Sequence, residues 1–369
     1  SAASDVYKRQ RRGQVQKKWD ALPLLWDCFP LLWHALPLLQ RIVRSPHNSG
    51  SGQKKRAFFC PSLLLRYLCS CDTIKNVRME KFELHILGCG SALPTTKHVP
   101  TSQVLSLRDK LFMIDCGEGT QLQMRKSRLR FSRLGHIFIS HLHGDHCFGL
   151  MGLISTFSLL GRTAPLHIHA PRELEGLMRP QLDFYCRGGS FEVVFRGFDP
   201  AVSECIFEDR SVSVTTIPLR HRLPCSGFLF EEKPGLPHIR RDMMDYLEIP
   251  VCEFNNIKLG ADWVRPDGTV MPNERLVKPA EPARRFAYCS DTAFVPANAE
   301  LVRGVDLLFH EATFGSADER RAAETFHSTA AQAAEFARLA GARRLVIGHY
   351  SSRYDDERQL LAESRAVFP

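Results

Sequence analysis

At 369 residues, of which 44% are apolar, the chain is long enough to bury a large core in one or two domains. Its net charge of +9 is typical of nucleic-acid-binding proteins, but the excess lies at the start of the sequence. Residues 1–78 contain 14 Lys and Arg against 4 Asp and Glu, whereas residues 79–369 contain 35 against 36. This distribution excludes a uniformly basic body, so any RNA contact made by residues 79–369 has to be local.

The first 78 residues differ from the rest. A heptapeptide of the form Trp-x-x-x-Pro-Leu-Leu occurs three times in succession, at 19–25, 26–32 and 33–39. A proline in every copy excludes a coiled coil and a membrane-spanning helix, so no membrane association is expected. Because all eight methionines lie at position 79 or later, we expect residues 1–78 to be a disordered leader that is not native, with the natural start at Met79. A basic targeting presequence is the alternative.

The 12 cysteines of the sequence have no regular spacing and form no CxxC pair. Scattered cysteines beside a candidate metal site indicate thiols that stay reduced. We therefore expect a cytoplasmic protein.

Strands and a tight turn open the body of the sequence. Residues 81–87 alternate between apolar and polar and predict a strand, and residues 101–107 and 110–114 predict two more. The third strand ends at Asp115-Cys-Gly-Glu-Gly119, where glycine allows a tight turn before a helix predicted over 120–127.

A dense group of potential metal ligands follows the next predicted strand, residues 136–140. Three imidazoles and a carboxylate lie within six residues: His141, His143, Asp145 and His146. The apolar stretch 147–160 after them predicts a buried helix. Imidazole and carboxylate suit zinc, with manganese or iron as alternative occupants. The turn therefore predicts a metal site at the carboxyl end of a strand, the alternative being ordinary surface histidines.

Two further histidines, His167 and His169, share one face of a strand predicted over 166–170. Histidines two apart in a strand could be metal ligands. They lie more often on an exposed face, and that is the expectation here.

A long insertion follows two more predicted strands, residues 191–195 and 211–217, the second of which leads into His221. Residues 231–284 are rich in proline, glycine and charge and have weak periodicity. Long segments of this kind inside a compact domain are usually functional, so we expect an inserted arm that binds substrate.

Three predicted strands after the insertion end in polar residues: 285–289 at Asp291, 305–309 at His310 and Glu311, and 344–348 at His349. A helix is predicted over 328–340, with Thr329 and Gln332 at capping-box spacing. With His141 and His221, polar residues thus follow five strands. One rim of an α/β protein can gather all of them into a site.

The order of these motifs resembles that of the metallo-β-lactamase superfamily and, within it, the ribonuclease Z family. The shared pieces are His141-Leu-His-Gly-Asp-His146 with Gly149-Leu-Met-Gly-Leu153, His310-Glu-Ala-Thr-Phe314, His327-Ser-Thr329 and Gly348-His-Tyr-Ser-Ser-Arg-Tyr354. The resemblance covers residues 79–369. It implies an α/β fold, an αββα sandwich of two mixed sheets with outer helices and a protruding arm, assembled as a homodimer.

The same resemblance implies a zinc-dependent endoribonuclease that removes the 3′ trailer from precursor tRNA and leaves a 3′-hydroxyl. It implies two zinc ions per chain. One would be held by His141, His143 and His221, the other by Asp145, His146 and His349, with Asp291 bridging the two.

Further roles follow for residues around the metals. Asp145 would also orient the nucleophile, and His327, oriented by Glu311, would protonate the departing oxygen. Arg353 and Lys97 would bind substrate, since a guanidinium suits phosphate. A purely metal-binding role for Asp145, a helix-capping role for His327 and a surface ion pair for Arg353 are the alternatives. The loop that carries Lys97 lacks the arginine and asparagine frequent in the family.

Other hydrolases share the seven ligands. A metal-dependent phosphodiesterase or a thiolester hydrolase of the same superfamily, acting on a small substrate, is therefore the alternative function. A non-catalytic tRNA-binding subunit is a third reading, which the complete ligand set disfavours.

Overall fold

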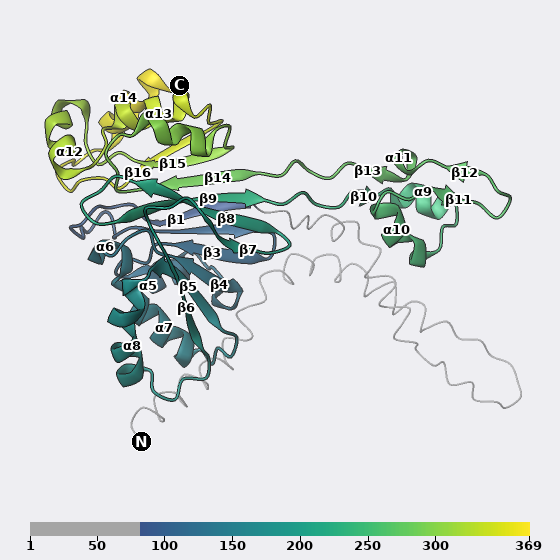
Figure 1. Cartoon of the computed structure of the whole chain (residues 1–369), viewed down its shortest axis with the longest axis horizontal. Helices are drawn as coiled ribbons and strands as arrows, with labels where there is room; N and C mark the ends of the chain where they lie inside the picture. The colour runs from purple at the N-terminus through teal and green to yellow at the C-terminus, as the bar shows by residue number, and fades with distance from the viewer. Residues whose placement is uncertain (1–81) are drawn as a thin grey trace, which may run out of the picture. The chain divides into compact units, whose positions relative to one another are not determined.

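The computed structural model describes residues 82–369. The expectations of a disordered, non-native leader at 1–78 and of a start at Met79 lie outside these residues. Within the described range, two six-stranded sheets lie face to face with helices on their outer sides (Figure 1). The predicted αββα arrangement of two mixed sheets is confirmed.

The first sheet has the strand order β1-β2-β3-β4-β5-β6. Its first three strands pair antiparallel and its last three continue in parallel, so the sheet is mixed. The strands are β1 (Phe82–Gly88), β2 (Ser102–Leu107), β3 (Lys110–Ile114), β4 (Leu134–Phe138), β5 (Leu166–Pro171) and β6 (Val193–Phe198).

The second sheet has the order β16-β15-β14-β9-β8-β7. Strands β14, β15 and β16 are parallel, and the remaining pairs are antiparallel. The strands are β7 (Cys205–Glu208), β8 (Val212–Leu219), β9 (Cys225–Glu232), β14 (Arg285–Cys289), β15 (Leu307–Glu311) and β16 (Leu345–Gly348).

Aromatic side chains fill the space between the sheets. Phe112 and Phe138 of the first sheet meet Phe230 of the second with ring centroids 6.1 and 5.3 Å apart, and Tyr288 stacks on Phe309 at 5.1 Å. All five are fully buried. Burial of each such ring contributes about 1.5–3 kcal/mol, and edge and offset contacts add to this. The interior thus joins the sheets rigidly and fixes where their strands end.

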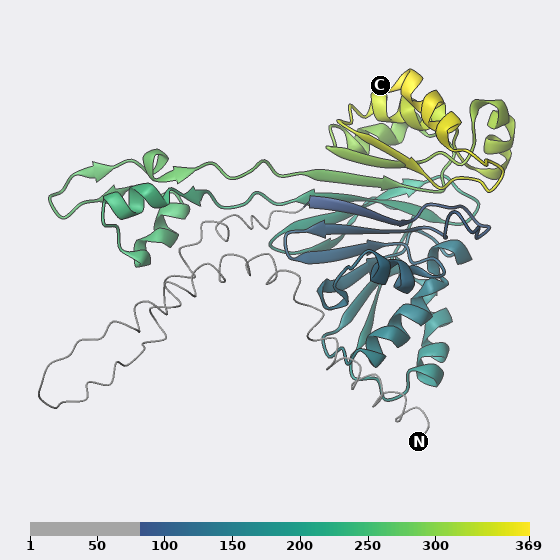
Figure 2. The same ribbon diagram turned by 180° about the vertical axis from the view of Figure 1, so that it is seen from behind.

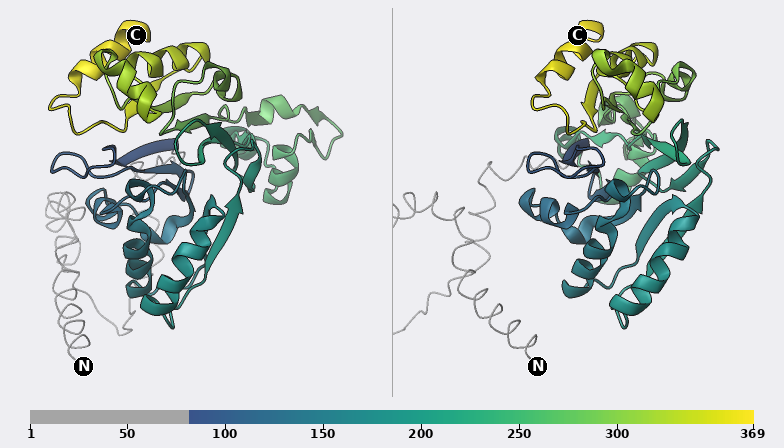
Figure 3. Two further views of the ribbon diagram at one scale, coloured as in Figure 1. Left: turned by 60° about the vertical axis from the view of Figure 1, so that its left-hand side comes forward. Right: turned by 90° about the vertical axis from the view of Figure 1, so that its left-hand side faces the viewer.

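Helices cover the two outer faces (Figures 2 and 3). On the first sheet they pack over one apolar cluster, and on the second over another. They are α5 (Thr120–Lys126), α6 (Gly144–Cys147), α7 (Gly149–Leu159) and α8 (Glu173–Tyr185) on the first side, and α12 (Glu319–Thr325), α13 (Ala330–Leu339) and α14 (Arg358–Val367) on the other.

Several elements differ from the sequence expectations. The predicted strand 136–140 begins and ends two residues earlier as β4, and 305–309 lies two residues later as β15. Strands β7 and β9 and helices α8 and α14 were not predicted. Strand β9 is buried along most of its length and shows no alternation, and α8 contains Pro180. Both features hide the usual periodic signal.

His169 does not lie on an exposed face, so that expectation is wrong. Its side chain is buried between the sheets, 3% exposed, and stacks on Phe138 with centroids 4.5 Å apart. His136 and His167 stack beside it, and the His136 Nδ1 and His169 Nε2 atoms are 3.2 Å apart. This face of β5 is buried because β7 of the opposite sheet covers it, and Phe207 of β7 contacts the His169 ring.

The segment between β9 and β14 has a small core of its own. Helices α9 (Arg241–Tyr246), α10 (Phe254–Lys258) and α11 (Asn273–Leu276) pack with the two-residue pairs β10 (His238–Ile239) with β13 (Val277–Lys278) and β11 (Trp263–Val264) with β12 (Val270–Met271). No residue of this core belongs to either large sheet. Figures 1 and 2 show the segment joined to the sheets through the stretches after β9 and before β14.

The root of this segment is held by charge. The buried Glu232 carboxylate accepts hydrogen bonds from Arg108 (3.3 Å) and Arg284 (3.0 Å). Separately, among residues 82–369 we find no helix with both the length and the apolar composition needed to cross a bilayer.

Candidate metal centre

Seven side chains converge where strands of both sheets end. They come from the turn after β4 and from the chain just beyond β8, β14 and β16. They are His141, His143, Asp145, His146, His221, Asp291 and His349. All seven are the residues that the sequence singled out as metal ligands.

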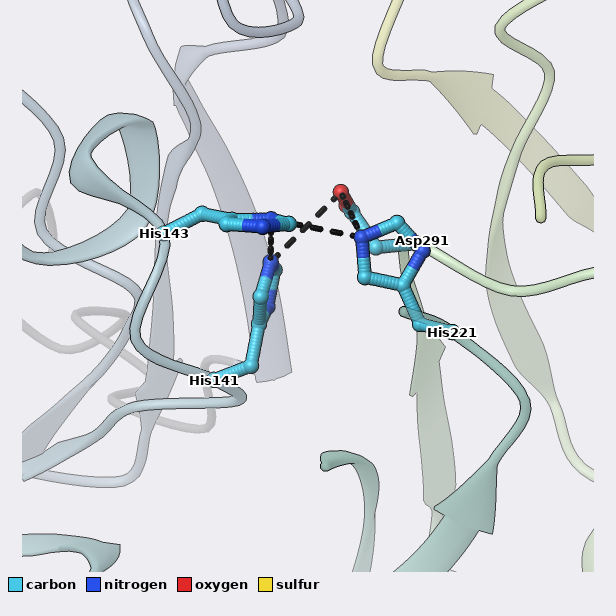
Figure 4. A group of neighbouring side chains, drawn as sticks. All are labelled: His141, His143, His221 and Asp291. Atoms are coloured by element: carbon cyan, nitrogen blue, oxygen red, sulfur yellow. Dashed lines mark hydrogen bonds and ion pairs between the residues drawn. The ribbon is translucent and has the colours of Figure 1, made fainter. Parts of the chain in front are cut away.

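One group combines three imidazoles with Asp291. Figure 4 shows His141, His143 and His221 with their nitrogens turned toward one another and toward the carboxylate. The His141 Nε2 and His143 Nδ1 atoms are 2.8 Å apart, and His221 Nε2 is 3.2 Å from the same His143 atom. One ligand atom from each of the four residues lies within 4.8 Å of all the others. A single cation can be bound by such a set.

A second group contains Asp145, His146 and His349, whose ligand atoms also lie within 4.8 Å of one another. The Asp145 Oδ2 atom is 3.4 Å from His146 Nε2 and 3.6 Å from His349 Nε2.

Asp291 stands between the two groups and gives one oxygen to each. Its Oδ2 atom lies 3.7 Å from His141 Nε2 and 3.8 Å from His221 Nε2. Its Oδ1 atom lies 3.2 Å from both His146 Nε2 and His349 Nε2. This geometry suits a carboxylate that bridges two cations.

A further observation indicates that these side chains suit metal ions. The Nε2 atoms of His146 and His349 are buried and have no hydrogen-bond partner among the described residues. A buried polar atom without a partner is costly, and a metal ion would satisfy both. These two atoms face the carboxylates of Asp145 and Asp291.

The second nitrogen of each buried imidazole is held by an oxygen. His146 Nδ1 lies 2.8 Å from Asp115, and His141 Nδ1 lies 3.0 Å from the Ser140 hydroxyl, which donates to the same Asp115 carboxylate. His349 Nδ1 lies 2.9 Å from the Thr313 hydroxyl. Such partners keep the proton on Nδ1 and leave the Nε2 lone pair for a cation.

The backbone of the centre is strained at the strand ends. Asp115, Asp291 and His349 have φ values of 57°, 55° and 61°, which residues other than glycine rarely adopt. Strain of this kind persists where surrounding structure enforces it, often at functional sites. A Cβ on Gly117 would lie 2.4 Å from the Asp145 carbonyl oxygen, so glycine is required for the ligand turn to approach.

The electrostatics of the ligands follow from burial and mutual contact. Burial lowers the pKa of His141, and the nearby His146 lowers it further. Burial opposes ionisation of Asp291, but His349 and His146 hold the pKa of its carboxyl well below the usual range. Asp291 is therefore a carboxylate at neutral pH.

His327 borders the centre without belonging to the seven. Its Nδ1 atom is 2.8 Å from the buried Glu311 carboxylate, and its ring lies 5.1 Å from His221 and 5.4 Å from His349. Burial lowers the pKa of His327, but Glu311 outweighs it and raises the pKa to about 9. The predicted pairing of His327 with Glu311 is therefore present in the fold, and the helix cap is provided by Thr329 instead.

A cavity of about 570 Å³ opens over the centre and is lined by His143, Asp145, His221, Asp291, His327 and His349. Arg353 lies on its wall, as do Arg222 and Arg321. Within residues 82–369 none of these three guanidiniums forms an ion pair, so the surface ion pair considered for Arg353 is absent. Arg222 and Arg321 were not predicted from the sequence. Arg222 adjoins His221, whereas nothing local marks Arg321.

Lys97, which the sequence predicts to bind substrate, lies outside the cavity lining. Its ammonium donates to the Asp355 carbonyl and, at 3.1 Å, to the Glu357 carboxylate, and it does not line the cavity. His98 Nε2 lies 2.7 Å from the same carboxylate. The loop is thus turned toward residues 355–357, and Lys97 fixes the loop instead of reaching the centre. His310 is also outside the cavity lining; its ring packs at a tilt against Phe336, with centroids 4.9 Å apart.

Two family models match parts of the chain. The model described as a beta-lactamase superfamily domain matches residues 276–350, and that described as anti-Pycsar protein Apyc1 matches residues 82–182. Together these ranges include the ligand turn, Asp291 and His349.

Similar proteins and structures point in the same direction. A protein of Bacteroides fragilis named Ribonuclease Z is 64% identical over 291 residues, which is 79% of this chain and 96% of that protein. Its namesake in Phocaeicola vulgatus is 63% identical over 79% and 94%. The crystal structure of human tRNase Z, short form, has a TM-score of 0.56 and 28% identity over 73% of this chain and 93% of that one. The metallo-beta-lactamase fold protein YhfI of Bacillus subtilis shares the fold, with a TM-score of 0.54 and 15% identity over 77% and 92%.

Proposed function

Because this chain belongs to the ribonuclease Z family, we propose that it removes 3′ trailers from precursor tRNA at a centre of two zinc ions. It is an endoribonuclease of tRNA 3′ processing with a metallo-β-lactamase fold. The observation that carries the proposal is the pair of ligand groups that share Asp291.

The residues divide between the two ions as follows. His141, His143 and His221 would hold one, Asp145, His146 and His349 the other, with Asp291 between them. When bound, such a pair lowers the pKa of water and offsets negative charge on a phosphate. Two carboxylates and one hydroxyl outside the set keep the ligands aligned: Asp115 holds His146, Thr313 holds His349, and Glu311 accepts the Thr313 hydroxyl bond at 2.5 Å.

The departing oxygen of the tRNA needs a proton. His327 is the proposed donor, since its Nδ1 is fixed by Glu311 and its Nε2 side remains for the cavity that it lines. A carboxylate partner fixes the tautomer and the orientation of the ring, as general acid catalysis requires. Asp145, which lines the same cavity beside the ligands, is proposed to orient the attacking water.

Phosphate binding is assigned to the cavity wall. Arg353, Arg222 and Arg321 lie around the centre, and their guanidiniums form no ion pair with any residue of 82–369. A planar guanidinium binds phosphate through two parallel hydrogen bonds, and an unpaired one has no competing carboxylate. These three residues account for local RNA affinity in a body whose charges balance.

The inserted segment, residues 231–284, is proposed to bind the tRNA away from the cut. It has its own core, and the side chains of Tyr246, Val251 and Leu259 on it are each at least two-thirds exposed. We also propose a homodimer that works in the cytoplasm. The free thiols of all cysteines in the described part of the chain support a reducing compartment.

The test is cleavage of a 3′-extended tRNA precursor by the full chain, with mapping of both new ends. We expect a cut beside the discriminator nucleotide, a 3′-hydroxyl on the tRNA, loss of activity with chelator and recovery with zinc. Metal analysis should give two zinc ions per chain and fewer in His349→Ala, whereas the control His85→Ala on β1 should retain both. Cleavage confined to small diesters or thiolesters would overturn the proposal.

A further inference from the structure

One aromatic ring at the cavity lies largely in solvent. Phe148 is 74% exposed, yet it lines the cavity together with His143 and Asp145. A phenylalanine left in water forgoes most of the stabilisation that burial provides. Packing of the fold therefore gives no reason for an aromatic side chain at this position.

The position of the ring is fixed by the ligand turn. Phe148 lies between α6 and α7, and its N–H donates to the Gly144 carbonyl at 2.9 Å. A Cβ on Gly144 would lie only 2.3 Å from Phe148 Cε2 and 2.6 Å from Cζ. The ring thus rests against the backbone of the one residue between His143 and Asp145, where a side chain would displace it.

This placement puts a flat apolar surface beside the centre that holds the scissile phosphate. The wall of the same cavity includes Ala92, Pro94 and Pro100, and the guanidiniums of Arg222 and Arg353. Unpaired nucleotides are bound by this combination, with bases stacked on aromatic rings and cations on the backbone. The two bases on either side of the cut belong to the nucleotides that share the scissile phosphate. With that phosphate at the metal centre, these are the bases that lie nearest to Phe148.

We propose that Phe148 is a stacking platform for the base of a nucleotide adjoining the scissile phosphate. The inference rests on the proposed function, because it requires a polynucleotide substrate with its phosphate at the metal centre. It makes Phe148 a positioning residue for the substrate, with no part in holding metal.

The first test compares kcat/KM on a precursor tRNA for Phe148→Leu and Phe148→Trp. We expect Leu to lower kcat/KM by roughly 5- to 150-fold, the range of one lost base–aromatic stack, and Trp to keep it near wild type. Phe184→Leu on α8 is the matched control, since Phe184 is 75% exposed and does not line the cavity. It should behave as wild type, and metal content and circular dichroism should be unchanged in all three.

The second test removes the base from the substrate. Precursors with one abasic residue, on the 5′ or on the 3′ side of the cut, are given to wild type and to Phe148→Leu. We expect wild type to cut one of the two abasic precursors as slowly as Phe148→Leu cuts the intact RNA. Phe148→Leu should cut that abasic precursor no more slowly than the intact RNA. The position of the abasic residue in that precursor identifies the stacked base.

Two results would overturn the inference while leaving the proposed function in place. One is normal cleavage by Phe148→Leu, and the other is an equal penalty of this variant on all three precursors. Failure of wild type to cut any precursor would instead remove the proposed function. A third overturning result needs no variant and applies even if Phe148→Leu fails to fold: wild type cuts the intact and both abasic precursors at the same rate.

Discussion

At the scale of single residues, the centre depends on atoms that the fold leaves unsatisfied. His146 and His349 each direct one nitrogen at an oxygen, and the other, buried, has no hydrogen-bond partner in the part of the chain that the structure describes. Asp115 accepts bonds from the Ser140 hydroxyl and the Tyr288 phenol as well as from His146, so one carboxylate aligns several elements. The site is therefore prepared before any cation enters.

The role of His327 can be separated from metal binding by the leaving group. If His327 protonates the departing oxygen, His327→Ala should lower kcat on precursor tRNA by about 10²- to 10⁴-fold. The same variant should lose little on bis(p-nitrophenyl) phosphate, whose leaving group needs no proton. Glu311→Gln should act in the same direction.

One outcome would contradict the role of His327 as a proton donor. Because Asp291, His327 and His349 could together hold a cation, equal losses on both substrates, accompanied by reduced zinc content, would make His327 a ligand.

The buried histidines between the sheets predict a pH dependence of stability. Burial and neighbouring imidazoles lower the pKa of His169 to about 3 and that of His136 to about 4. The unfolded chain takes up protons near pH 6.5, so their neutral packing contributes stability fully above that pH and loses it as pH falls toward 4. Urea unfolding of His169→Phe should therefore show a stability gain over wild type that grows by about 1–2 kcal/mol between pH 7 and pH 5.

The difference between variant and wild type removes effects of pH on metal binding, because both chains have the same centre. His85→Phe on β1, outside the cluster, is the control and should show no such growth. A gap for His169→Phe that stays constant with pH would contradict the prediction.

At the scale of elements, helix α13 shows how a local sequence signal becomes structure. The Thr329 hydroxyl accepts the Gln332 N–H at 3.2 Å, and the Gln332 side chain accepts the Thr329 N–H at 3.0 Å. This capping box, predicted from spacing, is confirmed. The capping box starts the helix two residues after His327, so it also fixes the backbone next to His327.

Thr329→Ala should destabilise the protein by about 1 kcal/mol, since the Gln332 N–H at the helix start loses its acceptor, the Thr329 hydroxyl. Thermal or urea unfolding measures this. Thr156→Ala on α7 is the control, because that hydroxyl only bonds the Gly152 carbonyl one turn earlier and should change stability by less than about 0.5 kcal/mol. Equal effects of the two substitutions would argue against the cap.

At the scale of the whole molecule, the separate core of the insertion predicts that it can be removed. Replacing residues 236–281 by a short Gly-Ser linker keeps the Glu232 root contacts and both sheets. We expect little change in Tm and in hydrolysis of a small diester. Cleavage of precursor tRNA should fall about tenfold or more, equivalent to about 1.4 kcal/mol of lost contacts.

The small-diester rate of the same variant is the internal control. Parallel loss on both substrates would mean that the segment supports the centre, and unchanged cleavage of precursor tRNA would remove its proposed role.

The sequence by itself determined the parts that depend on neighbouring residues. His141, His143, Asp145 and His146 lie within one turn, and alternation marked the strand that forms β1, so these features followed from local spacing. The fold class followed from the order of the motifs, which resembles that of a known superfamily. Elements without a periodic pattern, such as the uniformly buried β9 and the proline-containing α8, gave no such signal.

Only the tertiary structure decided which distant groups meet. It placed the two oxygens of Asp291 beside different ligand groups, brought Arg321 to the cavity, turned Lys97 toward Glu357 and buried His169 beneath β7. Each of these depends on a partner far away in sequence. Local composition cannot specify such pairings, because they are fixed by how the two sheets pack.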